Sequence, residues 1–177
     1  LYPDEPQDVR LEIQHEEQWQ EISSTTITYP GWSAHFRIPN WDNFQSFPYR
    51  IRHGKKAVFT GTIRKDPTDK DEIVVGNLSC NSSRDSGPRT HIVENLKKID
   101  PDLLFFAGDQ TYHHTEHTSG WIEFGLQFRD IIKDRPTITI PDDHDIGQAN
   151  LWGESGKQAS THEGPSGGYY YPIEYVT

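Results

Sequence analysis

Residues 102–112 read DLLFFAGDQTY, and the second half of the chain is interpreted around this stretch. An apolar run at residues 103–106 is followed by Gly108, which is the pattern of a buried parallel strand ending in a tight turn. The turn leaves the carboxylate of Asp109 at the carboxyl end of the strand. Because ligands of open α/β sheets bind beyond the carboxyl ends of the strands, Asp109 is a candidate site residue.

Two other apolar stretches end in the same way, at side chains of the kind that bind metals. Residues 73–79 (IVVGNLS) precede Cys80, and residues 136–141 (PTITIP) precede the run DDHD at 142–145. The three strand ends therefore supply a thiol, several carboxylates and an imidazole, which are all metal ligands.

The stretches between these strands have the pattern of helices. Residues 88–99 and 121–132 carry apolar side chains at helical spacing, and the candidate residues recur about every 30 residues, the length of one βαβ unit. We therefore predict an α/β fold whose βαβαβ half-sheet places Cys80, Asp109 and Asp143 on one edge.

The N-terminal part of the chain follows a different pattern, in which apolar and polar residues alternate and no helical period appears. The alternation covers residues 9–13, 32–38, 47–51 and 59–63. Turn signals separate these runs, which predicts a small antiparallel β-sandwich. We expect this β-sandwich module at residues 1–64, a polar linker at 65–72, and the α/β domain at 73–177.

Composition limits the classes of function. The chain has 177 residues and a formal net charge of -10, which argues against a broad nucleic-acid-binding face. An acidic protein that handles phosphate needs local cations, and bound metals would supply them. One cysteine excludes an internal disulfide, and no apolar run approaches the roughly 20 residues of a membrane span. The chain starts at Leu1 without any methionine and stops within a β-like run, so we expect both ends to be cut.

Each candidate also has an ordinary structural interpretation. A Gly-Asp turn such as that at Asp109 is commonly an Asx turn, and Cys80 is as readily a small buried hydrophobe as a metal ligand. The acidic run at 142–145 could be a solvated loop, but its like charges would crowd unless a cation were present. His144 would then lie near a metal-bound phosphate. Three further histidines have irregular spacing in a polar loop and are expected to be solvent-exposed: His113, His114 and His117.

Three motifs in this order resemble those of a known family. SCN at residues 79–81, GDQTY at 108–112 and DDHD at 142–145 look like the successive motifs of the PhoD-like alkaline phosphatases, within the calcineurin-like metallophosphoesterase superfamily. The preceding β-module is similar to that family's N-terminal sandwich domain. The resemblance implies hydrolysis of phosphate mono- and diesters by a hydroxide that bridges two metal ions.

The resemblance also implies a role for each candidate residue. Cys80 and Tyr112 would bind an iron(III)-like ion, Asp109 would bridge both metals, and Asp143 would bind the second metal, calcium(II). Zinc or manganese are alternatives. His144 matches the family's catalytic histidine. The family's remaining ligands would lie beyond Thr177, so we expect the 177-residue chain alone to be inactive. The family is periplasmic or extracellular, and the resemblance leaves the oligomeric state open.

The alternative function is that of a non-catalytic binding module. Trp19, Trp32 and Trp41 of the N-terminal module could bind carbohydrate or a partner, while the acidic run would bind a structural calcium ion. An exposed strip of tryptophans would favour this alternative, and burial of the same residues would favour a sandwich core.

Overall fold

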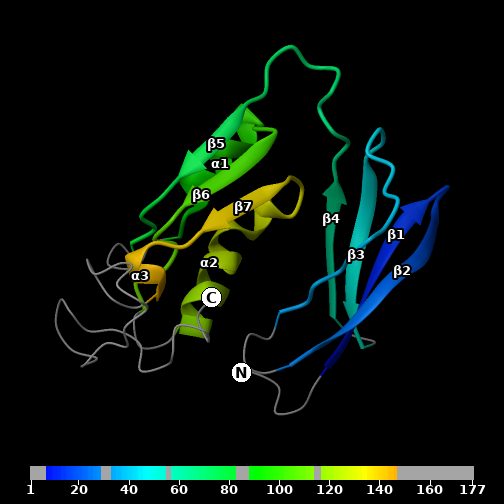
Figure 1. The fold of residues 1–177 in the computed structure, drawn as a ribbon, viewed down its shortest axis with the longest axis horizontal. Coiled ribbons are helices and arrows are strands. Elements are labelled where there is room, and N and C mark those ends of the chain that lie inside the picture. The colour runs from blue at the N-terminus through cyan, green and yellow to red at the C-terminus, as the bar shows by residue number, and fades with distance from the viewer. Residues whose placement is uncertain (1–6, 29–32, 55–56, 83–87, 114–116, 147–177) are drawn as a thin grey trace. The chain divides into compact units, whose positions relative to one another are not determined.

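The computed structural model describes residues 7–28, 33–54, 57–82, 88–113 and 117–146 (Figure 1). They form two compact units: residues up to 70 with 133–135, and residues 71–132 with those from 136 onward. The boundary lies inside the stretch for which the sequence predicts a linker. Asp66 N donates to Asn43 O at 2.8 Å, so the beginning of that stretch belongs to the first unit.

The first unit is built on a four-stranded antiparallel sheet. Its strands are β1 (Gln7–His15), β2 (Gln18–Ile27), β3 (Phe47–His53) and β4 (Ala57–Ile63), in the order β2-β1-β3-β4. Alternation along β1 buries Val9, Leu11 and Ile13 on one face, while Glu12 on the other face forms a salt bridge with Arg50. Among the described residues this unit holds one sheet and no helix, so the second sheet of a β-sandwich stays a prediction.

Two details of the first unit differ from the sequence-based expectation. Residues 33–38 form no strand, although their side chains alternate. Alternation alone does not make a strand, which also needs backbone hydrogen bonds to a neighbouring strand, and residues 33–38 pair with none of the four strands of this sheet. Conversely, β2 was not predicted, because its sequence QWQEISSTTI is rich in polar residues. β2 is an edge strand, where β-branched threonines are favourable and polar side chains remain exposed.

The second unit alternates strands and helices. Along the chain they are β5 (Val75–Leu78), α1 (Thr90–Ile99), β6 (Leu103–Ala107), α2 (His117–Ile132), β7 (Thr137–Ile140) and the one-turn helix α3 (Asp143–Ile146). The three strands are parallel, in the order β5-β6-β7. Asp100 ends α1 in a left-handed conformation, and its N–H donates to Leu96 O. Among the described residues, no helix is long and apolar enough to cross a membrane.

The core of the second unit lies between the sheet and both helices. Leu104 and Phe106 of β6 are buried, and the ring of Phe106 packs edge-on against Phe124 and Phe128 of α2, at 4.9 and 5.1 Å between centroids. Val93 of α1 joins the same cluster. Each buried side chain of this size contributes about 1.5–3 kcal/mol. Both helices therefore cover one face of the sheet, as right-handed crossovers between consecutive parallel strands require (Figure 1).

The opposite face of this sheet is only partly covered. Val75, Ile138 and Ile140 are 44–50% exposed. The strand at residues 103–106, which the sequence predicts to be buried, has Leu104 and Phe106 buried on the helical face. What the fold provides is a firmly packed helical face, which holds the carboxyl ends of β5, β6 and β7 side by side.

Candidate metal centre

The turns after β5 and β6 place two candidate residues in the left-handed region of backbone conformation. Cys80 has φ of 56° and Asp109 has φ of 58°, a region that costs a non-glycine residue about 1–2 kcal/mol. Backbone hydrogen bonds join the two turns: Cys80 N donates to Gly108 O at 3.1 Å, and Asn81 N donates to Asp109 O at 2.8 Å. The strained turns thus support each other.

Gly108 is required by this arrangement. Its φ is 90°, and a Cβ added there would lie 2.5 Å from Cβ of Asp142. The absence of a side chain lets the β6 turn approach the turn after β7, and therefore brings all three strand ends together.

The Asp109 carboxylate is the centre of the cluster. Its side chain is buried, and Oδ2 accepts a hydrogen bond from the Tyr112 hydroxyl at 3.1 Å. The same oxygen lies 3.8 Å from Sγ of Cys80, while Oδ1 accepts the backbone N–H of His144 at 3.3 Å. One carboxylate therefore contacts residues from all three strand ends.

Asp143 and His144 complete the cluster from α3. One ligand atom each of Asp109, Asp143 and His144 can be chosen so that all lie within 4.8 Å of one another. The His144 ring also packs on the Tyr112 ring, at 4.1 Å between centroids. The structure thus brings together all five candidate residues, which are up to 64 positions apart in the sequence (80 to 144).

The electrostatics of the cluster are suited to a cation. Burial raises the pKa of the Tyr112 phenol above its usual value, and the neighbouring Asp109 carboxylate raises it further. Without a cation, the phenol stays protonated and donates a hydrogen bond to Asp109. A nearby positive charge would favour the phenolate instead. Carboxylates, a phenol, a thiol and an imidazole at these distances therefore fit a metal centre.

Asp145 has a different role from its neighbours in the acidic run. It is 1% exposed, and it accepts three backbone N–H groups: Asp109 at 2.6 Å, Asp142 at 3.0 Å and Thr111 at 3.0 Å. Burial raises the pKa of Asp145, and these hydrogen bonds oppose the rise. Asp145 thus ties the β6 turn to the β7 turn. Nothing in the sequence DDHD distinguishes this inward carboxylate from the others.

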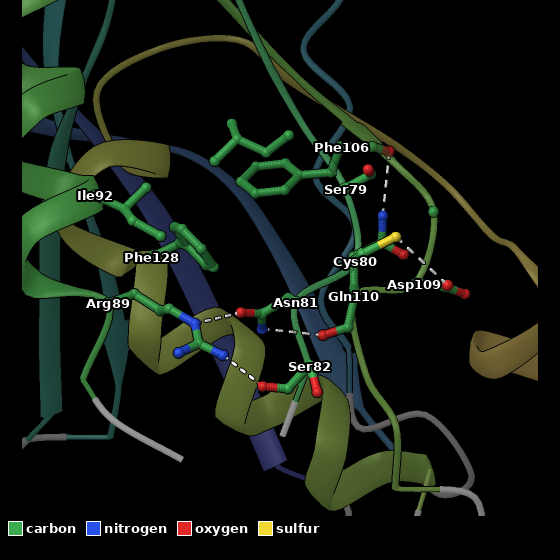
Figure 2. Close-up of a pocket in the computed structure, with 12 residues that line it drawn as sticks. Ser79, Cys80, Asn81, Ser82, Arg89, Ile92, Phe106, Asp109, Gln110 and Phe128 are labelled. Atoms are coloured by element: carbon green, nitrogen blue, oxygen red, sulfur yellow. Dashed lines mark hydrogen bonds between the residues drawn. The ribbon is translucent and has the colours of Figure 1, made fainter. Parts of the chain in front are cut away.

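A cavity of about 240 Å³ adjoins the cluster beside Cys80 and Asp109 (Figure 2). Apolar side chains of Phe106 and Phe128 line one side, and Asn81 lines another. Cys80 is exposed, so the interpretation of this cysteine as a buried hydrophobe is wrong. Its thiol is accessible to a ligand from the cavity side.

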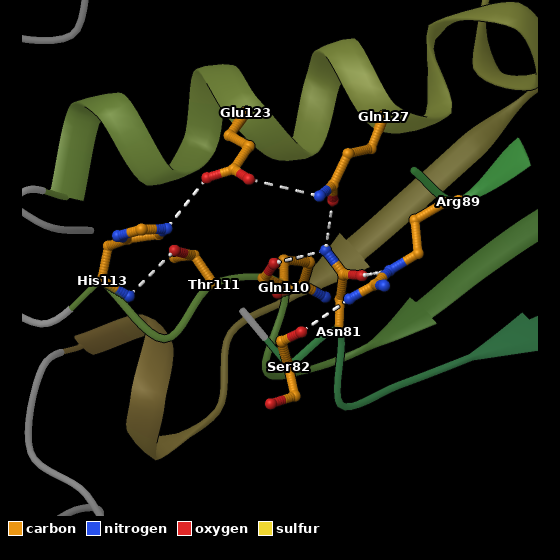
Figure 3. A network of polar contacts seen from close by, with 8 residues as sticks. All are labelled: Asn81, Ser82, Arg89, Gln110, Thr111, His113, Glu123 and Gln127. Carbon is orange, nitrogen blue, oxygen red and sulfur yellow. Dashed lines mark hydrogen bonds and ion pairs between the residues drawn. The ribbon is translucent and has the colours of Figure 1, made fainter. Parts of the chain in front are cut away.

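Sequence reasoning did not identify the polar residues that support the two turns. Asn81, Glu123 and Gln127 form a hydrogen-bonded chain beside the cluster (Figure 3). His113, which was expected to be exposed, is half-buried and lies 2.9 Å from Glu123. The other two histidines of that loop, His114 and the side chain of His117, lie outside the described residues.

The tryptophans of the first unit give no exposed strip among the described residues. Trp19 is half-buried, with the Arg50 guanidinium 4.3 Å from its ring centroid. Trp41 is half-buried and packs edge-on against Phe47 at 5.0 Å. Trp32 lies outside the described residues. The feature that would have favoured a binding module is therefore not present in the described part of this unit.

Comparisons with known proteins identify the fold. No family model matches the chain, and no curated protein matches it by sequence. Among solved structures, purple acid phosphatase PPD1 from yellow lupin (Lupinus luteus) seeds matches with a TM-score of 0.56 and 15% identity, over 88% of this chain. The chain spans 34% of the length of that protein. A likeness at this identity concerns the fold alone, and the chain therefore shares its fold with part of a purple acid phosphatase.

Proposed function

We propose that this chain carries part of the active site of a metal-dependent phosphoesterase that hydrolyses phosphate mono- and diesters. The observation that carries the proposal is the convergence on Asp109 of groups from three strand ends. The fold shared with a purple acid phosphatase supports the same general class of reaction. The motif order further favours a PhoD-like enzyme within that class.

The donor chemistry suggests how two ions would be held. The Cys80 thiol and the Tyr112 hydroxyl both contact the same carboxylate oxygen of Asp109, Oδ2. A thiolate together with a phenolate would suit iron, with zinc as an alternative. Asp143 offers carboxylate oxygens, which suit calcium or manganese. Oδ2 of Asp109 faces Cys80 and Tyr112 while Oδ1 faces His144, which supports the proposal that Asp109 would be shared by two ions.

The protein residues have distinct tasks in the proposed reaction. Bound metal ions supply a water of lowered pKa and neutralise charge on the phosphoryl oxygens. Asp109 and Asp143 would hold the ions, and the turn at Gly108 fixes the position of Asp109. His144 is held by its backbone bond to Asp109 and by its contact with Tyr112. Its imidazole would donate a proton to the leaving oxygen of the ester.

The test is a paired assay on the full-length protein. Metal content is measured by mass spectrometry beside hydrolysis of a chromogenic monoester and diester. Asp109→Asn should lose both metal and activity. His144→Ala should keep the metal and lose about 10²–10⁴-fold in rate, as for other general acids. The 177-residue chain alone should show little activity.

Each outcome has a separate meaning. Loss of metal from His144→Ala would show that His144 is a ligand rather than a proton donor. Wild-type turnover by His144→Ala on both esters would remove its catalytic role and favour a structural calcium site. Robust hydrolysis by the 177-residue chain would show that its ligand set is sufficient.

A further inference from the structure

The residues that directly follow two proposed ligands are both anchored to one edge of α2. Asn81 follows Cys80, and its Nδ2 donates to Oε1 of Gln127 at 2.8 Å. His113 follows Tyr112, and its Nε2 lies 2.9 Å from Oε2 of Glu123. Glu123 and Gln127 are one helical turn apart. Gln127 Nε2 approaches Glu123 Oε1 at 3.4 Å, so the two anchors form one connected edge (Figure 3).

Asn81 forms several hydrogen bonds besides the one to Gln127. Its Nδ2 also donates to Gln110 O at 3.1 Å, and its Oδ1 accepts Nε of Arg89 at 2.6 Å (Figure 2). Its backbone N–H donates to Asp109 O at 2.8 Å. A single side chain therefore joins the turn after β5, the turn after β6, α2, and Arg89, the residue that precedes α1.

This polar edge is not needed to attach α2 to the sheet. Phe124, Phe128 and Ile131 of the same helix are buried in the core and already fix the helix in place. The edge instead fixes the turns, whose proposed ligands Cys80 and Asp109 have strained backbones. A link between two left-handed turns limits how far they can separate when like charges gather there.

We propose that the Glu123–Gln127 edge of α2 is a positioning element that sets the separation of the turns carrying Cys80, Asp109 and Tyr112. As far as it concerns metal binding, the inference rests on the proposed function. Residues behind metal ligands orient them, and their substitution typically lowers metal affinity about 10–100-fold. The Asn81–Gln127 contact is a half-buried hydrogen bond, whereas the His113–Glu123 contact is an ion pair only when His113 is protonated, and both of its side chains are nearly half-exposed. Gln127 should therefore have the larger effect.

The first measurement is amide hydrogen exchange of the metal-free protein, which is independent of the proposed function. Gln127→Met keeps the length of the side chain and removes both hydrogen bonds. This substitution should speed exchange of the backbone N–H of Asn81 about tenfold, because that N–H donates to Asp109 O and so connects the two turns. The Leu104 amide, which bonds to Pro136 O at the opposite end of the sheet, should be unchanged. Unchanged exchange at Asn81 would overturn the proposal.

The second measurement is the metal dissociation constant, obtained by competition with a chelator. Gln127→Met should raise it about 10-fold or more. Asn81→Ala should raise it at least as much, because it also removes the bonds to Gln110 O and Arg89. Adding Gln127→Met to Asn81→Ala should have little further effect, because the Asn81–Gln127 bond is already absent. Asp130→Met is the matched control, because it replaces a polar side chain of the same helix by the same residue. The Asp130 carboxylate forms an ion pair with Lys97, away from the cluster. This control should leave the constant unchanged.

The outcomes separate this inference from the proposed function. An equal rise in the dissociation constant for Asp130→Met and Gln127→Met would show general loosening of α2 and overturn the positioning role. If the full-length protein binds no metal but Gln127→Met still speeds exchange at Asn81, the edge positions the turns and the proposed function is wrong.

Discussion

Asp145→Asn should destabilise the second unit through one identifiable hydrogen bond. The carboxylate Oδ2 accepts two N–H groups, from Asp109 and Asp142, and Oδ1 accepts one, from Thr111. An asparagine side chain has one oxygen, which is best placed at the Oδ2 position, where the N–H groups of Asp109 and Asp142 both donate. Its NH₂ group then takes the Oδ1 position and faces the N–H of Thr111. A buried donor without a partner costs about 1–3 kcal/mol. We therefore expect the free energy of unfolding to fall by about that amount.

The assay is equilibrium unfolding of the metal-free protein in urea, with Asp142→Asn as the matched control. Asp142 is exposed and its Oδ1 accepts one neighbouring N–H, an acceptor that asparagine retains. The control should change stability by less than about 0.5 kcal/mol. An equal effect of the two substitutions would refute the assignment of Asp145 as the buried anchor.

The pKa of Asp145 gives this prediction a pH dependence. Because burial raises the folded-state pKa, wild-type Asp145 contributes stability that is fully present below the unfolded pKa of about 3.9. This contribution is lost as the pH rises through the folded-state pKa. The difference between wild type and Asp145→Asn should therefore decrease from acidic to neutral pH. A difference that grows over that range would contradict the raised pKa.

Two further predictions concern the turn and the phenol. Gly108→Ala should cost about 2–4 kcal/mol in thermal or urea unfolding, because backbone strain adds to the overlap with Asp142. Gly54→Ala, at φ of 56° with open space around it, should cost only the strain of about 1–2 kcal/mol, and equal costs would rule out the overlap. Adding a metal ion to the metal-free protein at neutral pH should raise the ultraviolet difference absorbance of tyrosinate, and Tyr112→Phe should abolish the rise. An unchanged signal in that variant would exclude Tyr112 as a ligand.

The positions of the candidate residues along the fold were accessible to sequence reasoning because they depend on local patterns. Apolar runs that stop at Cys80 and Asp109 indicate strand ends, and the spacing of βαβ units orders those ends along a sheet. Cys80, Asp109 and Tyr112 therefore came out of the pattern and the motifs together. The same patterns failed at residues 33–38, which alternate without pairing to the sheet, and at β2, an edge strand whose sequence is rich in polar residues.

The supporting contacts could not be predicted, because they depend on side-chain directions between distant segments. Asn81 and Gln127 are 46 positions apart, and no periodicity connects them. Asp145 and Asp143 are chemically identical in the sequence, and only the one-turn helix α3 directs one inward and the other toward Asp109. Local patterns thus identify the candidates, while packing determines which of them are held in place.

Metal binding by the 177-residue chain itself tests the central claim most directly. The metal-free protein is dialysed to equilibrium against iron, calcium, zinc or manganese, and bound metal is measured by elemental analysis. Asp66→Asn serves as the control, because Asp66 is an exposed residue of the first unit. We predict at least one ion per chain in the wild type and in Asp66→Asn, and loss of that ion in Asp109→Asn. Absence of bound metal in the wild type, or equal binding in Asp109→Asn, would contradict the assignment of this cluster as a metal centre.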